Sequence, residues 1–243
     1  MPPNQPIQCA RAPKKRKQCA YCGIQLDNGS KTRDHVVPSA MWGGKGHLPP
    51  APFLVPSCDA CRSLDEGVSV FRNAVVAQSD TEANPIAHRV LYSTVDRHLT
   101  AQPQAMAAFC RDMRLLERRT GTEVRRGLGF YWPESDSDPT PHKITRGLFF
   151  KKTGLVLPAS YEVTVYREHE PEYGELLRTR GHQLSEWEDC GDRRREGVNA
   201  FRMRYLPDPN WLYYSIWQFE FYSSVRFFTT TSERGKLGVR LLL

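Results

Sequence analysis

Two Cys-x-x-Cys pairs constrain this chain more than any other feature of its sequence. Cys19 and Cys22 stand in CAYCG, and Cys58 and Cys61 stand in CDACRS. Zinc prefers four sulfur or nitrogen ligands in a tetrahedron, and two such pairs supply them from separate segments of a chain. The spacing predicts one structural zinc ion that holds residues 19–26 against the start of the following helix. Because four thiolates leave no open coordination position, any chemistry must come from the residues that the ion holds in place.

Disulfide bonds and membrane spans are not expected. The chain has seven cysteines, an odd count, and no secretory signal, so a reducing compartment is favoured. The single cysteines Cys9, Cys110 and Cys190 are then free thiols or small buried side chains. No apolar run reaches the roughly 18–20 residues that a membrane span requires. We therefore expect a soluble, cytoplasmic protein without membrane contacts.

The dipeptide Asp34-His35, followed by Val-Val-Pro, lies between the two cysteine pairs. A carboxylate can bind a hard divalent cation, and an imidazole that titrates near neutral pH can deprotonate a water molecule. Together they suit hydrolysis of a phosphodiester, in which the cation neutralises the charge that develops on the phosphate. Elsewhere such a dipeptide is more often a surface or N-cap pair. Its position between two zinc pairs in a basic chain favours the catalytic interpretation.

Positive charge is concentrated in two segments of the chain, whose formal charge is +7. Residues 1–35 carry seven lysines and arginines against two aspartates, a net charge of +5, and six arginines lie between residues 111 and 126. Clustered cations favour a polyanion, because each neutralised phosphate releases condensed counterions. The sequence predicts nucleic acid as the partner, with contacts from Lys14, Lys15, Arg16, Lys17, Arg33 and Arg62. A solvated basic tail and an ordinary helix surface are the alternative.

The pattern along the chain predicts an α+β protein. Residues 1–18 form a basic arm, 19–80 the zinc-bearing unit, 81–132 a helical segment, 133–142 a linker and 143–243 a β-rich C-terminal domain. Within the arm, the run from Pro13 to Lys17 also resembles a nuclear-localisation signal, so a nuclear location is the alternative if the source is eukaryotic.

Particular elements follow from local signals. FLVPSC predicts a strand, Asn84-Pro85 caps a helix, and Met106, Phe109, Met113 and Leu116 predict a second helix over 104–119. Near the end, WQFEF and VRFFTTT around Ser223-Ser224 predict an antiparallel hairpin. Trp217, Phe219 and Phe221 share one face of it, which favours sheet core over a surface for stacking bases.

The run CAYCG, TRDHVVP and LVPSCDACRS resembles the HNH endonuclease family, in which a ββα-metal fold is often held by a zinc ion on four cysteines. The later segments HKITRGLFFKKTGLVLP and WQFEFYSSVRFFTTT are similar to bacterial HNH proteins of this length. The resemblance implies His35 as general base and Asp34 as ligand of Mg²⁺ or another divalent cation. It implies Cys19, Cys22, Cys58 and Cys61 as the zinc ligands. The expected partner is nucleic acid, with DNA favoured over RNA, although no residue pattern distinguishes the two.

Two positions depart from the family pattern. No Asn occurs in LPPAPFLVPSC, which contains the predicted strand, and Arg62 stands where the family places a further Asn or His ligand after the last cysteine. An arginine cannot ligate a cation. The nearby carboxylates Asp59, Asp65 and Glu66 are the candidate substitute ligands, and Asp65 is favoured because it lies one helical turn beyond Cys61. Two hypotheses follow: a metal-dependent endonuclease, or a catalytically silent HNH-like zinc module that binds nucleic acid or assembles with other proteins.

Overall fold

The computed structural model describes residues 18–26, 32–44, 48–49, 53–63, 67–120, 123–130, 139–189, 200–208 and 212–235. The predicted basic arm, with Lys14, Lys15, Arg16 and Lys17, lies outside these described residues, and so does Asp65.

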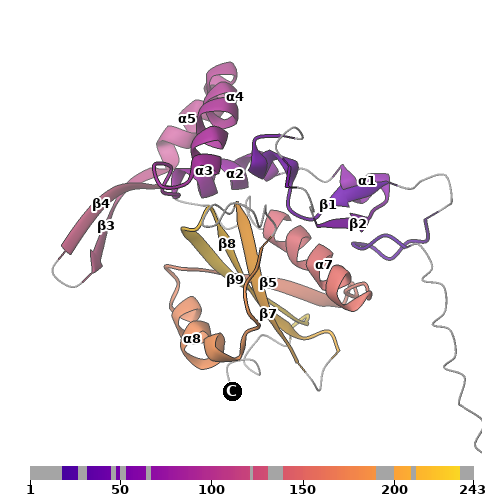
Figure 1. The fold of residues 1–243 in the computed structure, drawn as a ribbon. Coiled ribbons are helices and arrows are strands. Elements are labelled where there is room, and N and C mark those ends of the chain that lie inside the picture. The colour runs from indigo at the N-terminus through magenta and orange to yellow at the C-terminus, as the bar shows by residue number, and fades with distance from the viewer. Residues whose placement is uncertain are drawn as a thin grey trace, which may run out of the picture.

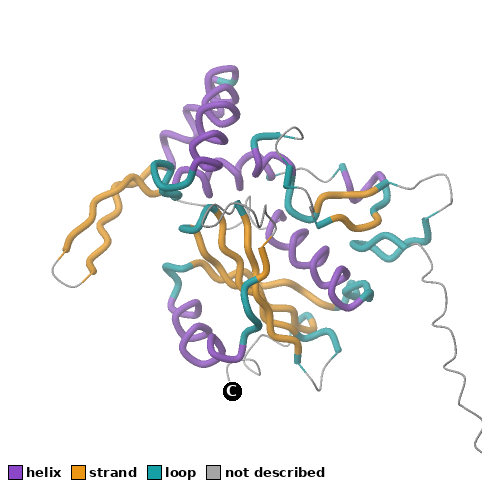
Figure 2. Tube along the Cα trace, viewed as in Figure 1, coloured by secondary structure: helices purple, strands orange, loops and turns teal. Residues whose placement is uncertain are grey.

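The predicted α+β class is confirmed: helices and antiparallel sheets share the chain, and the C-terminal part is built on one sheet (Figures 1 and 2). The helices and helical turns are η1 (Ser39–Trp42), α1 (Asp59–Arg62), α2 (Val68–Ala77), α3 (Pro85–Val90), the π-helical turn η3 (Leu91–Val95), α4 (Asp96–Ala101), α5 (Pro103–Asp112), α7 (Pro139–Thr153), α8 (Pro171–Arg180) and η4 (Gly181–Gln183). None of the helices in the described part of the chain is both long and apolar enough to cross a membrane.

Within the described ranges the strands form three separate antiparallel sheets. They are β1 (Arg33–His35), β2 (Leu54–Pro56), β3 (Met113–Thr120), β4 (Glu123–Phe130), β5 (Tyr161–Arg167), β6 (Glu188–Asp189), β7 (Phe201–Pro207), β8 (Ser215–Phe221) and β9 (Val225–Glu233). β1 pairs with β2, β3 pairs with β4, and the remaining five have the order β5-β9-β8-β7-β6. In the first pair Asp34 lies opposite Val55 and His35 opposite Leu54, so the Asp-His dipeptide is part of a short hairpin.

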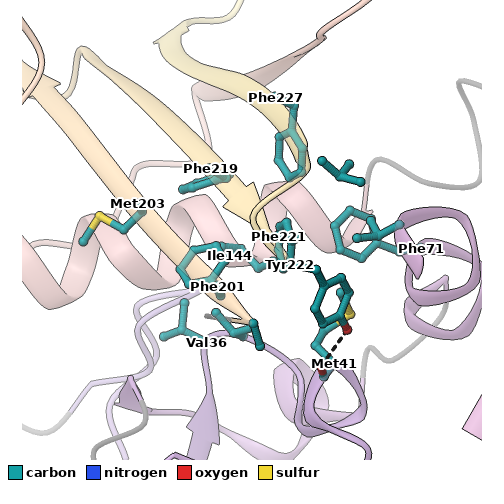
Figure 3. Close-up of a cluster of buried hydrophobic side chains, with 14 of the residues drawn as sticks. Val36, Met41, Phe71, Ile144, Phe201, Met203, Phe219, Phe221, Tyr222 and Phe227 are labelled. Carbon is teal, nitrogen blue, oxygen red and sulfur yellow. Dashed lines mark hydrogen bonds between the residues drawn. The ribbon is translucent and has the colours of Figure 1, made fainter. Parts of the chain in front are cut away.

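One face of the five-stranded sheet forms the main core. Trp217, Phe219 and Phe221 of β8 are at most 1% exposed, which confirms that this aromatic stripe is sheet core. Figure 3 shows Phe219 and Phe221 together with Ile144 of α7 and Val36 of the N-terminal unit. Because one continuous cluster contains residues from Ala20 to Phe227, the cysteine-bearing unit and the C-terminal sheet bury their apolar surface against each other.

α7 lies against the N-terminal unit at close range. A Cβ at Gly147 would stand 2.9 Å from Val36 Cγ2 and 3.3 Å from the ring of Tyr21, so this helix position needs a residue without a side chain. A second link comes from the β8–β9 turn, where the buried Tyr222 hydroxyl donates to the carbonyl of Met41 at 2.6 Å (Figure 3). These contacts fix β1 beside α7.

The opposite face of the sheet carries α8 and a smaller core of Tyr173, Leu176, Ile216 and Phe228. Polar side chains of β8 also lie there and are buried. Gln218 donates to the Tyr173 hydroxyl at 2.8 Å. Glu220 forms ion pairs with one arginine from β7 and one from β9. In Figure 1, α7 and α8 lie on opposite sides of the sheet.

Several local predictions are confirmed. The Asn84 side chain accepts from the backbone N–H groups of Ile86 and Ala87, and Pro85 begins α3, as the capping signal indicates. FLVPSC contains β2, and β8 and β9 form the predicted C-terminal hairpin.

Two local predictions are wrong. The helix predicted over 104–119 ends at Asp112, and β3 begins at Met113 and pairs with β4. The predicted linker 133–142 overlaps the first turn of α7, which starts at Pro139. Proline is tolerated in a first helical turn because its missing N–H has no intrahelical partner there, so Pro139 and Pro141 are compatible with a helix start.

Candidate functional site

Two tight turns present the four paired cysteines. In the first, Gly23 has φ +77°, and its N–H donates to the Cys19 carbonyl at 3.0 Å, while the Cys19 N–H donates to the Ile24 carbonyl at 2.9 Å. In the second, Cys58 is the N-cap of α1, and its Sγ accepts a hydrogen bond from the backbone N–H of Cys61, with 3.5 Å between nitrogen and sulfur. Backbone N–H groups directed at sulfur are typical of metal-binding knuckles, because they stabilise a thiolate.

The four sulfur atoms lie within 4.8 Å of one another, and Cys22 Sγ is 3.8 Å from Cys58 Sγ. A zinc–sulfur bond of about 2.3 Å gives an edge of about 3.8 Å in a regular tetrahedron. The cluster is therefore close enough to hold a metal ion, and its geometry is compatible with structural zinc. The Ala20 N–H also donates to the Pro56 carbonyl at 2.9 Å, so the first turn is attached directly to β2.

The thiols differ in their tendency to ionise. Burial works to raise the pKa of Cys19, but backbone hydrogen bonds from Cys58, Cys22 and Tyr21 outweigh it and bring that pKa down to about 7. Burial, followed by hydrogen bonds with Cys58 and Cys22, raises the pKa of Cys61. Without a cation the cluster cannot hold four thiolates, because like charges at this separation repel. A divalent ion removes that repulsion.

Asp34 carries an ion pair that the sequence did not reveal. Its Oδ2 is 3.0 Å from Nζ of Lys143 in α7, and the two side chains are only 13% and 11% exposed. The ammonium also lies 5.5 Å from the centre of the Tyr21 ring. Although the charges are balanced, Oδ2 is buried and accepts no hydrogen bond of normal geometry from the described residues. Asp34 is thus electrostatically paired but incompletely satisfied.

Tyr21 closes the same site from the first cysteine turn. Its buried hydroxyl also lacks a hydrogen bond of normal geometry within the described part of the chain. Burial, followed by the negative charge of Asp34, raises the pKa of the Tyr21 phenol. The phenol therefore stays protonated and remains a potential donor beside the carboxylate.

His35 is half-buried on β1, next to Asp34. Consecutive strand residues alternate in direction, but His35 is the last residue of β1, so its side chain can turn out of that alternation. A second imidazole, His142, precedes Lys143 on α7. Burial, and then the charge of Arg146, lowers the pKa of His142 to about 4, so this histidine is neutral at physiological pH.

The two described arginines of the predicted nucleic-acid surface are exposed or partly so. Arg33 is exposed at the start of β1. Arg62 is half-exposed at the end of α1, and its guanidinium lies 3.5 Å from Asp59, one turn earlier on the same helix. Among the described residues, the four cysteines form the one group of three or more potential metal ligands, so no such group surrounds Asp34.

The structure thus brings together the four cysteines, and it adds Lys143 and Tyr21 to Asp34. Sequence reasoning missed both residues. The alternating basic and apolar pattern of HKITRGLFFKK could have indicated a helix with one buried lysine, but nothing local points to the carboxylate 109 positions earlier that pairs with it.

Comparison of the chain with protein-family models, with curated proteins and with solved structures found no match.

Proposed function

We propose that this chain is an HNH-type endonuclease that hydrolyses phosphodiester bonds of nucleic acid, with Asp34 and His35 at its active site. The observation that carries the proposal is the buried carboxylate of Asp34, whose Oδ2 has the Lys143 ammonium at 3.0 Å but no aligned hydrogen bond from the described residues. Such an atom in a folded protein calls for an explanation, and an absent ion or a catalytic role is among the usual ones. Its neighbour in the sequence is an imidazole suited to proton transfer.

The carboxylate of Asp34 is a suitable ligand for one hard divalent cation. Mg²⁺ is commonly bound through one or two carboxylates together with substrate phosphates and water, so Asp34 alone is a sufficient protein anchor and Arg62 is not needed as a ligand. Asp65 is the candidate for a second carboxylate. When bound, Mg²⁺ or a similar cation neutralises charge on the scissile phosphate and on the leaving oxygen.

The residues of the chain have separate tasks in this proposal. His35 accepts the proton of the attacking water. Lys143 balances Asp34 before substrate binds, and its ammonium can then contact a phosphate oxygen. Zinc on the four cysteines takes no part in the reaction, because a closed tetrahedral site only holds the β1–β2 hairpin in place. Exposed Arg33 contacts the nucleic-acid backbone beside the site.

A second candidate function is a catalytically silent zinc module that binds nucleic acid or protein partners through Arg62 and the basic arm. The Asp34–Lys143 ion pair favours it, because the lysine already supplies the positive charge that a divalent cation would bring. In that case Asp34 serves to attach α7 to β1.

The first experiment compares two histidines. Zinc-loaded protein is incubated with single- and double-stranded DNA and RNA in the presence of Mg²⁺ or Mn²⁺. We expect His35→Ala to lower the cleavage rate by about 10²-fold or more, as loss of a general base does. The matched control is His169→Ala, which removes an exposed imidazole from the turn after β5. Equal rates in the two variants would contradict the role of His35.

The second experiment asks whether Asp34 binds a cation. Mn²⁺ binding to zinc-loaded protein is followed by electron paramagnetic resonance. Lys143→Gln should bind Mn²⁺ several-fold more tightly than the parent protein, because a competing cation has been removed, and Asp34→Asn should not bind it. Absence of Mn²⁺ binding in both proteins, together with absence of cleavage by the parent, would establish the silent module instead.

A further inference from the structure

The β3–β4 hairpin is a two-stranded ribbon that projects away from the central sheet (Figure 1). Its eight paired positions run from Met113 opposite Phe130 to Thr120 opposite Glu123. At about 3.4 Å per residue the ribbon is about 24 Å long. Neither strand belongs to the five-stranded sheet, and β4 contacts α2.

The ribbon is basic: residues 113–130 contain five arginines and two glutamates, a net charge of +3. Alternate residues of a strand share a face, and directly opposed residues lie on the same face. One face therefore holds Arg114, Leu116, Arg118 and Thr120 with Glu123, Arg125, Gly127 and Gly129. The other holds Met113, Leu115, Glu117 and Arg119 with Val124, Arg126, Leu128 and Phe130. We call the first the Arg–Gly face.

Two features of the Arg–Gly face work against the stability of an isolated hairpin. Arg118 lies directly opposite Arg125, and like charges at opposed positions destabilise a strand pair. Gly127 and Gly129 lie opposite Leu116 and Arg114, and glycine inside a strand weakens it. Strand glycines often mark a place where a ligand or another backbone approaches closely. Both features become favourable when a polyanion lies against this face.

We propose that the β3–β4 ribbon docks on duplex DNA by placing its Arg–Gly face in the major groove. The proposal rests on the proposed function in so far as the substrate is nucleic acid. The major groove of B-form DNA, about 12 Å wide and 8.5 Å deep, admits a two-stranded ribbon. Arg118 and Arg125 neutralise phosphates or contact guanine edges, and Gly127 allows close approach of the backbone.

Duplex DNA fits this ribbon better than duplex RNA or a second copy of the chain. The major groove of A-form RNA is too narrow and deep for side chains to read. A second copy would bring an equally basic face against the first, so repulsion would oppose pairing through it. The ribbon is thus a candidate for the surface that holds the substrate while Asp34 and His35 act.

A pair of double variants tests the proposal. Arg118→Gln/Arg125→Gln and Arg119→Gln/Arg126→Gln each remove two positive charges from neighbouring positions, but from opposite faces of the ribbon. Binding of the full chain to a 25-base-pair DNA duplex, as the probe, is measured by fluorescence anisotropy at several salt concentrations without divalent cation. The first variant should bind at least tenfold more weakly, with a salt slope reduced by about 2. The second should change affinity less than threefold.

Gly127→Thr gives a second test that leaves the charge unchanged. Gly127 lies inside β4, and extended strand backbone accepts any residue other than proline. The added side chain should weaken DNA binding severalfold while the salt slope stays the same, because it blocks close approach without removing a phosphate contact. Thermal unfolding of every variant shows whether the ribbon change has affected the rest of the chain.

Several results would overturn the proposal. Equal losses in the two double variants would mean that the arginines act only through net charge. Tighter binding of duplex RNA than of duplex DNA would exclude a major-groove ribbon. Unchanged DNA binding, combined with a dimer that the Arg118/Arg125 variant dissociates in sedimentation, would make a second copy the partner. Binding is measured without cleavage and repeated with His35→Ala, so a failed ribbon and a failed endonuclease give different results.

Discussion

Two buried carboxylates, Asp34 and Glu220, are held in opposite ways. The Glu220 side chain has no exposed surface and accepts hydrogen bonds from Arg202 at 2.5 and 2.9 Å and from Arg226 at 2.6 Å. Asp34 has one ammonium, 3.0 Å from its buried Oδ2, and the described residues give that oxygen no aligned hydrogen bond. The first arrangement is complete and fixes three strands of the sheet. The second is a single ion pair without an aligned hydrogen bond, so the carboxylate can exchange the lysine for another cation.

This difference separates a structural charge from a candidate functional one. Planar guanidinium groups match a carboxylate at two points and lose little freedom in doing so, whereas an ammonium on a flexible chain is a point charge that can be exchanged. Burial alone would raise the pKa of Glu220, but the hydrogen bonds and charges of Arg202 and Arg226 outweigh it and lower that pKa. A comparable set of partners is absent from the described surroundings of Asp34.

The largest effect on folding is expected from loss of the cysteine cluster, because this cluster positions the strand that carries Asp34. Cys58→Ser should lower the zinc content from about one ion per chain to near zero and unfold the N-terminal unit, because structural zinc contributes about 10 kcal/mol or more to small domains. Elemental analysis and far-ultraviolet circular dichroism measure both. The matched control is Cys110→Ser, at an exposed free cysteine on α5. A folded, metal-free parent protein would disprove the zinc site.

The next effect compares the carboxylates directly. Glu220→Gln should destabilise the protein by about 3 kcal/mol, since it leaves two arginines beside a buried amide. Asp34→Asn/Lys143→Gln, which removes the second ion pair as a whole, should cost less than about 1 kcal/mol, because it leaves no buried charge without a partner. Urea unfolding at neutral pH measures both. Equal losses would show that Asp34 is as structural as Glu220.

The same pair gives a pH signature. The folded-state pKa of Glu220 is below its unfolded value, so the folded state binds fewer protons in that range. Its contribution to stability is present above the unfolded pKa, about 4.3, and is lost as the pH falls through the folded pKa. Glu220→Gln should therefore flatten the acid side of the stability profile.

The smallest effect concerns how closely α7 approaches Asp34. Gly147→Ala should destabilise the protein by about 1–2 kcal/mol, because the added methyl group would stand 2.9 Å from Val36. The matched control is Gly174→Ala in α8, where a Cβ meets nothing within 4 Å. That change should stabilise by about 0.5–1 kcal/mol through helix propensity. Stabilisation by both would show that α7 is free to move away from β1.

Signals confined to a few neighbouring residues predicted the structure well. Asn84-Pro85, the aromatic alternation of β8 and the two cysteine pairs each specify their geometry within a short window, and the structure agrees with all three. The ribbon was missed because arginine and leucine also suit a helix, and the apolar residues from Met106 to Leu116 follow helical spacing. Gly121-Thr122, between two β-compatible runs, was the overlooked hairpin signal.

The partners of Asp34 could not be predicted because they depend on tertiary packing. Lys143 reaches the carboxylate because Gly147, one turn later in α7, has no side chain and so lets the helix pack closely against Val36. No local pattern states which of the lysines on α7 will be buried. The resemblance to HNH proteins predicted roles for Asp34 and His35, but it did not predict which residue neutralises Asp34.

The shared core has a consequence for how the chain is made. Ala20, Val36 and Val55 bury against strands that end near Phe227, so the cysteine-bearing unit leaves the ribosome well before its packing partners exist. At roughly 5–20 residues per second, the delay between Val55 and Phe227 is about 10–35 seconds. During that interval a metal ion bound by the four thiols would hold the two cysteine turns of the nascent unit together. Zinc supply during synthesis, rather than after it, should therefore determine the yield of folded protein.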